Sequence, residues 1–220
     1  MALVSPDGDQ GFPGELTVKA DYELAGNTLR LSLEATTSKP TPLSLSAHPY
    51  FNLAGLSAGE IYGHEITIAA DRFLPTDRQQ IPTGEIRPVD GSIFDLREPT
   101  VIGSRIRCTD EQLLFGKGYD HYFILQDTTG DQLRIAARVY DPGSGRVLEA
   151  LTTQPGTQFY AGNNLNGSVA GRGGAYRQSA GLALEPQGFP DAPNRPDFPS
   201  TVLRPGSVYR QVIAYRFTTQ

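Results

Sequence analysis

The chain has 220 residues, of which 38% are hydrophobic, and its formal net charge is −5 at pH 7. This length allows one sizeable core, and all-β domains often reach it as one unit, so we expect a single domain over residues 1–220. The small net charge, without runs of like charge, argues against a nucleic-acid or anionic-membrane partner, and no apolar stretch is long enough to span a bilayer.

The composition favours short strands joined by turns, because the chain holds 24 glycines and 17 prolines. Cys108 is the only cysteine, which excludes an intrachain disulfide and a thiolate metal site built from this chain alone. A lone cysteine is usually a small core residue, so we expect Cys108 to be buried.

Segments that alternate apolar and polar residues at period two predict β-strands. In chain order they are Leu16–Tyr22, Leu29–Ala35, Leu43–Ala47, Glu65–Ala69, His121–Leu125, Leu133–Tyr140, Val147–Thr152, Gln158–Ala161, Gly181–Glu185 and Tyr209–Phe217. Turn signals such as Gly26-Asn27 and Pro205-Gly206 separate them. Many short strands joined by such turns predict an all-β fold, a large antiparallel β-sandwich, rather than βαβ units.

Three segments depart from this pattern. The apolar stub at residues 1–4 is equally compatible with a short terminal strand and with the end of a longer one. Residues Ser104–Leu113 are weakly amphipathic and form the one helix that we expect. The segment Asn163–Ser179 is rich in glycine and asparagine and predicts a surface loop.

His48 lies in the run Ala47–Leu53, where it ends a strand-like segment and precedes a proline, so its backbone should be extended. Tyr50, Phe51 and Asn52 follow it. Aromatic faces pack on the C–H surface of a sugar ring, while imidazole and amide groups bond its hydroxyls, so this segment suits a sugar pocket. From its position alone, a buried structural histidine remains an open alternative.

Two carboxylates stand at the ends of apolar strands. Asp120 opens the strand that contains His121 and is either a turn cap or a site carboxylate. Glu185 ends the apolar run Gly181–Leu184, where burial would raise its pKa and suit it to general acid–base work near neutrality. A glutamate at the rim of the sheet is the alternative. Sequence patterns of zinc hydrolases, P-loop enzymes and dinucleotide oxidoreductases are absent from the chain.

Several segments together resemble the aldose 1-epimerase family, in family order over essentially the whole chain. They are Ser5–Gly14, His48–Leu53, His64–Asp71, Phe73–Pro75, Ile81–Glu85, Gly118–His121, Thr152–Tyr160 and Glu185–Asn194. The resemblance implies a β-sandwich of the galactose mutarotase-like type. It also implies interconversion of the α and β anomers of aldohexoses such as galactose and glucose, with no metal and no cofactor.

The resemblance also assigns roles to individual residues. It implies Glu185 as the general base and His48 as the general acid of ring opening, because that reaction removes one proton and delivers another. It implies that Asp120 and Gln158 bond sugar hydroxyls and that Tyr50 lines the pocket. A small aldohexose is then the expected partner of a cytoplasmic monomer or weak dimer that binds neither nucleic acid nor membrane.

One departure from the family pattern sets a further expectation. Family members carry an amino-terminal region before the segment that resembles Ser5–Gly14, and it holds an arginine and a second histidine, in a His-Gly-Gly context, that face the sugar. No His-Gly-Gly occurs in this chain. We therefore expect a truncated chain with reduced or no activity alone. The alternatives are a hexose-6-phosphate 1-epimerase, which needs cationic side chains at the pocket, and a non-catalytic carbohydrate-binding sandwich.

Overall fold

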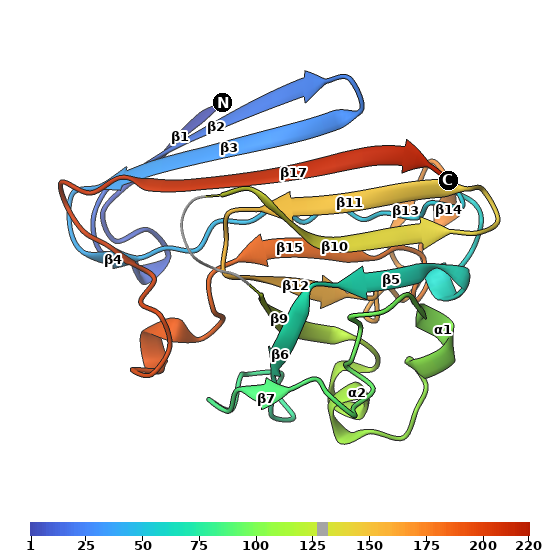
Figure 1. The fold of residues 1–220 in the computed structure, drawn as a ribbon. Coiled ribbons are helices and arrows are strands. Elements are labelled where there is room, and N and C mark those ends of the chain that lie inside the picture. The colour runs from blue at the N-terminus through green and yellow to red at the C-terminus, as the bar shows by residue number, and fades with distance from the viewer. Residues whose placement is uncertain (127–131) are drawn as a thin grey trace.

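The computed structural model describes residues 1–126 and 132–220, and in this part of the chain two large antiparallel sheets pack face to face (Figure 1). The eight-stranded sheet has the order β1-β2-β3-β17-β11-β10-β5-β8, with bounds Ala2–Ser5, Leu16–Ala25, Thr28–Thr37, Tyr209–Thr219, Arg146–Thr152, Arg134–Asp141, Glu65–Ile68 and Thr100–Val101. The five-stranded sheet has the order β15-β12-β9-β6-β7, with bounds Ala183–Gln187, Gly156–Tyr160, Asp120–Leu125, Ala70–Leu74 and Arg87–Pro88. The predicted all-β antiparallel sandwich is confirmed.

The remaining elements are short. Two small ladders join β4 (Thr41–Pro42) to β16 (Val202–Leu203) and β13 (Ala170–Gly171) to β14 (Gly174–Ala175). The helices are α1 (Ile102–Arg105) and α2 (Glu111–Gly116), with 3-10 turns η1 (Asp9–Gly11), η2 (Ile61–Gly63) and η3 (Ala192–Asn194). None of the helices in the described residues has the length and apolar character needed to cross a membrane.

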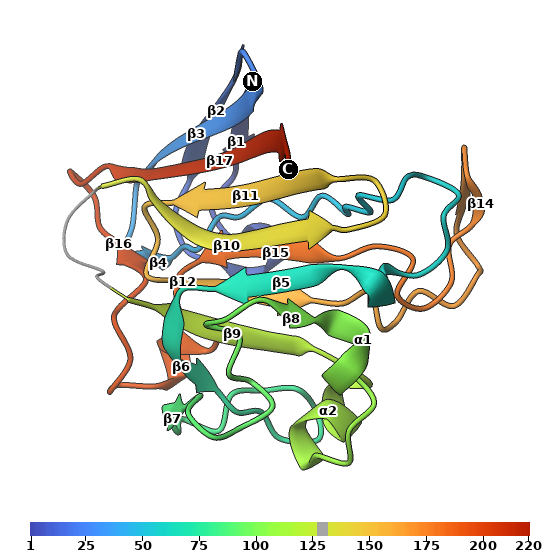
Figure 2. The same ribbon diagram turned by 45° about the vertical axis from the view of Figure 1, so that its right-hand side comes forward.

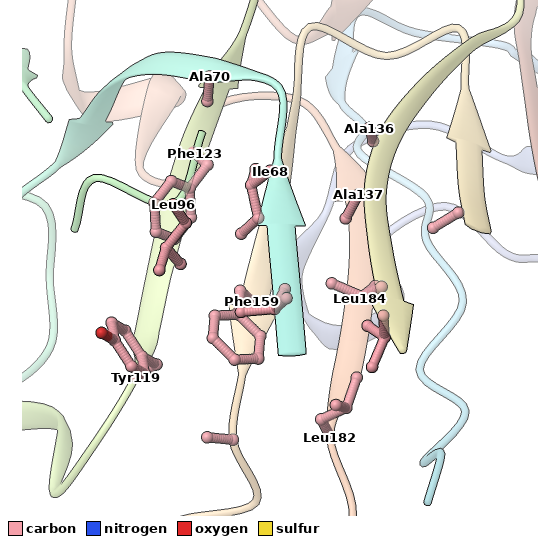
Figure 3. Close-up of a cluster of buried hydrophobic side chains, with 14 of the residues drawn as sticks. Ile68, Ala70, Leu96, Tyr119, Phe123, Ala136, Ala137, Phe159, Leu182 and Leu184 are labelled. Carbon is pink, nitrogen blue, oxygen red and sulfur yellow. The ribbon is translucent and has the colours of Figure 1, made fainter. Parts of the chain in front are cut away.

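The core lies between the two sheets, and the period-two alternation of the strands decides which side chains enter it. In β9, Phe123 points into the core, and Phe159 of β12 and Leu184 of β15 do the same. Figure 3 shows them facing Ile68 of β5 and Ala137 of β10 from the opposite sheet. Because successive side chains of a strand alternate, the residues between these core positions lie on the other face of the five-stranded sheet.

One edge of the eight-stranded sheet continues beyond the area that the second sheet covers, and Figures 1 and 2 show β1, β2 and β3 extending away from it. Tyr22 and Leu24 of β2 share a face with the core residue Leu31, because Tyr22 pairs with Leu31 and Leu24 with Leu29 in the β2–β3 register. Tyr22 is nevertheless 56% exposed and Leu24 74% exposed, whereas Leu31 is 4% exposed. The apolar face of the eight-stranded sheet is therefore not fully covered: at Tyr22 and Leu24 it is exposed to solvent.

One predicted strand, Leu43–Ala47, is wrong. Residues 43–50 have no regular secondary structure and join no ladder, and Leu43 donates its backbone N–H to the carbonyl of Thr201. Leu45 and Ala47 are partly buried against the core. The alternation therefore reports burial correctly, but it belongs to a segment that packs against the core without joining a sheet. The other predicted strands are present with shifted ends. The strand β6 and the two-residue strands were not predicted from the sequence.

The predicted helix Ser104–Leu113 is also wrong, because α1 and α2 are two separate helices with a break between them. Asp110 lies in the extended region and its side chain accepts a hydrogen bond from the N–H of Gln112, which begins α2 at this point. Cys108 lies in the break and is exposed, so the expectation of a buried cysteine is wrong as well.

The edge strand β15 is held to the opposite sheet by hydrogen bonds to two of its carbonyls. Tyr215 of β17 donates its hydroxyl to the carbonyl of Leu184 at 3.0 Å. Gln211 of β17 donates its amide to the carbonyl of Pro186 at 2.8 Å, and the hydroxyl of Ser46 donates to the same oxygen at 2.9 Å. An edge strand leaves every second carbonyl without a ladder partner, so these side chains satisfy groups that would otherwise be buried unpaired.

Replacing Tyr215 with Phe tests this anchor. The variant keeps the ring but leaves the Leu184 carbonyl without its donor, so we expect the free energy of unfolding to fall by about 1 kcal/mol. Urea denaturation of wild type and Tyr215→Phe measures the difference. Tyr22→Phe is the matched control because Tyr22 is largely exposed. Equal stability of Tyr215→Phe and wild type would contradict the anchoring role.

Candidate functional site

A cavity of about 420 Å³ opens on the face of the five-stranded sheet that points away from the core. Its lining residues are His48, Tyr50, Leu74, Thr76, Gln80, Pro82, Asp120, Tyr122, Gln158, Tyr160, Asn164, Glu185, Gln187 and Pro190. The five side chains predicted from the sequence (His48, Tyr50, Asp120, Gln158 and Glu185) all belong to this lining. A volume of this order suits a small polar ligand.

The register of three strands explains why polar groups from distant parts of the chain meet here. Gln158 of β12 pairs with Glu185 of β15 on one side and with Tyr122 of β9 on the other. Tyr160 pairs with Asp120 in the same ladder. Since directly paired residues share a face, the register brings these side chains to one surface of the sheet.

His48 meets Glu185 at the mouth of the cavity. The His48 Nε2 lies 3.2 Å from the Glu185 Oε1, with the imidazole side chain 46% exposed and the carboxylate side chain 15% exposed. The ring centre of Tyr50 lies 4.9 Å from that of His48, and the ring centre of Tyr160 lies 6.0 Å from it. The His48 imidazole is therefore open to solvent, whereas the Glu185 carboxylate is largely enclosed.

The segment that carries His48 is tied to the β15 chain on both sides. Ser46 bonds the Pro186 carbonyl, and Phe51 exchanges two backbone hydrogen bonds with Leu182, at 2.8 and 2.9 Å. Between these ties Pro49 restricts His48 to extended geometry. Hydrogen bonds on either side of His48 and of Glu185 therefore hold the two backbone segments together, which brings the imidazole and the carboxylate within reach of each other.

Burial raises the pKa of the Glu185 carboxyl, and the negative charge of Asp120 adds to this effect, while the nearby His48 opposes it. Burial also raises the pKa of Asp120, against the hydrogen bonds from Gln158 and Gln80 that stabilise its charged form. Two carboxylates in one enclosed site therefore both favour protonation more than exposed carboxylates do. A glutamate in this state is a stronger base than a solvated one and suits proton transfer near neutrality.

The two oxygens of Asp120 are each bonded by a glutamine amide. Gln158 Nε2 donates to Oδ1 at 2.8 Å, and Gln80 Nε2 donates to Oδ2 at 3.1 Å. Gln158 was predicted from the sequence and Gln80 was not. Tyr160 was not predicted either, although it lies two residues after Gln158 in β12, so the period-two pattern could have placed it on the same face. Nothing in the local pattern around Gln80 signals its position, because a loop brings it to the cavity.

The other two histidines lie outside the cavity lining. His121 is fully buried, its Nδ1 accepts the backbone N–H of Asp120, and burial lowers its pKa to about 3. His64 is buried as well, and its Nε2 accepts the backbone N–H of Leu53. Both side chains are buried and bonded to a backbone N–H, which gives them a structural role. No group of three or more His, Cys, Asp or Glu side chains in residues 1–126 and 132–220 is arranged to hold a metal ion.

The family model described as aldose 1-epimerase matches residues 1–216. The chain belongs to this family. Galactose mutarotase from Rattus norvegicus is 46% identical over 219 residues, which make up 99% of this chain and 62% of that relative. Aldose 1-epimerase from Escherichia coli K12 is 39% identical over 100% of this chain and 64% of its own length. This aldose 1-epimerase family chain thus spans less than two thirds of these relatives.

Solved structures agree with the family assignment. A galactose 1-epimerase from Lactobacillus acidophilus superimposes with a TM-score of 0.84 at 30% identity, over 99% of this chain and 61% of that one. An aldose epimerase homologue from C. elegans superimposes with a TM-score of 0.86 at 27% identity, over 99% of this chain and 64% of that one. The resemblance read from the sequence motifs is confirmed, and so is the galactose mutarotase-like fold.

The raised pKa of Glu185 has a consequence for stability. Its folded-state pKa lies above the ordinary value of 4.5, so its protonated form favours folding, and that contribution is lost as the pH rises through the folded-state pKa. Glutamine imitates the protonated form. We therefore expect Glu185→Gln to match the wild-type melting temperature near about pH 4 and to exceed it near about pH 8.

Glu85 supplies a control of opposite sign, because its hydrogen bond to Arg87 lowers its pKa. Glu85→Gln should lose stability at the higher pH, if it changes at all. Thermal melts at both pH values measure the two variants together. A Glu185→Gln protein that melts below wild type at the higher pH would contradict the assigned direction of the Glu185 pKa.

Proposed function

We propose that this aldose 1-epimerase family chain interconverts the α and β anomers of a free aldohexose. The observation that carries the proposal is the enclosed Glu185 carboxylate, 3.2 Å from the half-exposed His48 imidazole, in a cavity of about 420 Å³. The names of the relatives from Rattus norvegicus and Escherichia coli, a galactose mutarotase and an aldose 1-epimerase, support the same chemistry.

Ring opening needs one base and one acid. Glu185 takes the proton of the C1 hydroxyl while His48 delivers a proton to the ring oxygen, so the bond between C1 and the ring oxygen breaks as the C1 carbonyl forms. Rotation about the C1–C2 bond presents the other face of the carbonyl. On ring closure, Glu185 returns its proton to the C1 oxygen, and His48 takes the proton of the C5 hydroxyl, whose oxygen becomes the ring oxygen again. Both groups are then back in their starting protonation states.

The remaining polar groups have binding roles in this proposal. Asp120 and Gln158 accept and donate hydrogen bonds to sugar hydroxyls, and Tyr50 offers a ring face to the C–H surface of the sugar. Holding the sugar in one orientation makes both proton transfers intramolecular, which lowers their entropic cost.

A hexose-6-phosphate is disfavoured by the charge of the site. Glu185 and Asp120 both line the cavity, and their negative charges would repel a phosphate group. Among the described residues, no lysine or arginine lines the cavity, so no cationic side chain there could bind a phosphate. A non-catalytic sugar-binding role predicts saturable sugar binding without anomerisation and is separated from the proposal by the assay that follows.

The assay is the optical rotation of freshly dissolved α-D-galactose or α-D-glucose with the purified chain. We expect relaxation faster than the spontaneous rate, and we expect Glu185→Gln and His48→Asn each to lower the enzymatic rate constant by about 100-fold or more, since general acid–base groups contribute about 10²–10⁴-fold.

Glu85→Gln serves as the control, because Glu85 lies outside the cavity and should leave the rate unchanged. Relaxation at the spontaneous rate, from a wild-type protein that melts cooperatively, would refute the catalytic proposal and favour the binding role. The sequence predicts reduced or no activity for the chain alone, so the rat galactose mutarotase is assayed in parallel to measure how far the rate of this chain falls below it.

The pH dependence of the rate gives a second test. Glu185 acts as the base in its charged form, and its pKa is raised above 4.5, so kcat/KM should fall as the pH drops through a midpoint above that value. The pH at which kcat/KM falls on the acidic side should therefore be higher than for an enzyme whose base is a solvated glutamate. A profile that stays flat down to about pH 4.5 would contradict the assignment of Glu185 as the base.

The proposal extends to partner and location. We expect the aldohexose as the small-molecule partner, and a monomer or weak dimer without nucleic acid or membrane contacts. A cytoplasmic location is supported by Cys108, because a free and exposed thiol is preserved in a reducing compartment.

A further inference from the structure

Gln80 reaches the cavity from a loop that is closed on itself. The loop follows β6, and Thr76 and Pro82 form an isolated bridge at its base. The Asp77 side chain accepts the backbone N–H groups of Gln79 at 2.9 Å and Ile81 at 3.0 Å, and its own N–H donates to the Ile81 carbonyl at 2.9 Å. One aspartate thus fixes the backbone on both sides of Gln80.

The same loop is held from outside by side chains of two other segments. The buried Gln112 of α2 accepts the N–H of Thr76 at 2.7 Å and donates to its carbonyl at 2.9 Å. Arg195, just after η3, donates to the carbonyl of Pro82 and pairs with Asp191 at 2.8 Å. The base of the loop is therefore anchored at both ends.

Gln80 itself has a φ of 63°, in the left-handed region that residues other than glycine rarely adopt. Such conformations persist where the surroundings determine them, and they cluster at binding sites. Here the backbone that Asp77 fixes carries the Gln80 amide to the Asp120 Oδ2, at 3.1 Å. Its exposed neighbour Gln79 occupies the same loop but is no part of the cavity lining.

Gln80 completes the support of the Asp120 carboxylate. Gln158 holds Oδ1 from the strand and Gln80 holds Oδ2 from the loop, so the plane of the carboxylate is fixed by two donors on rigid elements. Each carboxylate oxygen can accept more than one hydrogen bond, so both oxygens keep capacity for sugar hydroxyls.

We propose that Gln80 is a positioning residue of the sugar site, which holds the Asp120 carboxylate in the orientation that accepts sugar hydroxyls. The inference rests on the proposed function for the identity of the ligand, but not for the contact between Gln80 and Asp120. It adds to the site a residue that lies between the family-like segments Phe73–Pro75 and Ile81–Glu85 and belongs to neither.

The test compares Gln80→Met with Gln79→Met. Methionine keeps the length of the glutamine side chain and removes its amide, and Gln79 is the matched control one residue away. The first measurement is the pH titration of the Asp120 side-chain carboxyl by ¹³C NMR in the free protein, assigned with Asp120→Asn. The titratable groups that face Asp120 are His48, Glu185, Tyr50 and Tyr160, and all are unchanged in both variants.

We expect Gln80→Met to raise the Asp120 midpoint, because it removes a donor that stabilises the charged carboxylate. The second measurement is the affinity for D-galactose by NMR titration, which we expect to weaken by roughly tenfold, the usual effect of losing one hydrogen bond to a charged group. Gln79→Met should change neither quantity. Gln80→Glu sets a second carboxylate against Asp120 and should raise the midpoint further.

An unchanged Asp120 midpoint in Gln80→Met and Gln80→Glu would overturn the proposal, whatever the affinity. A raised midpoint with unchanged galactose affinity would also overturn it, because Asp120 would then bind sugar without that support. If Gln80→Met fails to melt cooperatively, the Asp120 midpoint and the galactose affinity are measured in Gln80→Glu instead, and the same outcomes support or overturn the proposal. A wild-type chain that shows no mutarotation refutes the proposed function, and the Asp120 titration still decides the contact.

Discussion

The position of Glu185 depends on hydrogen bonds that cross from one sheet to the other. β15 is an edge strand, and an edge strand is free to bend or slip unless something replaces its missing neighbour. Tyr215 and Gln211 of β17 take that role by donating to the carbonyls of Leu184 and Pro186, the residues on either side of Glu185. Pro186 lacks an N–H and so cannot join an incoming strand at that position, which protects the edge. The carboxylate at the site is thus fixed by the packing of the whole sandwich.

The division of labour between the two faces of the five-stranded sheet follows from the same strands. In β9 and β12 one set of side chains fills the core, with Phe123 and Phe159 among them, and the alternate set lines the cavity. A shift of register by one residue would exchange the two sets. The hydrophobic core therefore specifies the register, and the register specifies which polar groups meet. The same strand register therefore determines both the packing of the core and the geometry of the site.

Much of this arrangement could be predicted from local sequence, for a physical reason. Alternation reports burial on one face, so it located most of the strands and placed Asp120 at the first residue of β9. Glu185, expected at the end of its strand, lies in the middle of β15. The same signal misplaced Leu43–Ala47, because a segment laid along the core alternates without joining a sheet. Gln80 could not be found this way, since its contact with Asp120 depends on a loop closed by Asp77 and Gln112. Contacts made by loops depend on three-dimensional closure that no short pattern encodes.

The uncovered part of β2 has a practical consequence. Tyr22 and Leu24 contribute little buried surface despite their size, so polar replacements there give up little of the free energy that apolar burial supplies. The same replacements would break up an apolar strip of the kind that promotes association between molecules. Solubility and folding stability can therefore be adjusted separately in this protein. The strip lies on a different sheet from the one that forms the floor of the cavity. Tyr22 lines a second cavity together with His48, whereas Leu24 lines neither cavity, so Leu24 is the position that can be changed without disturbing the site.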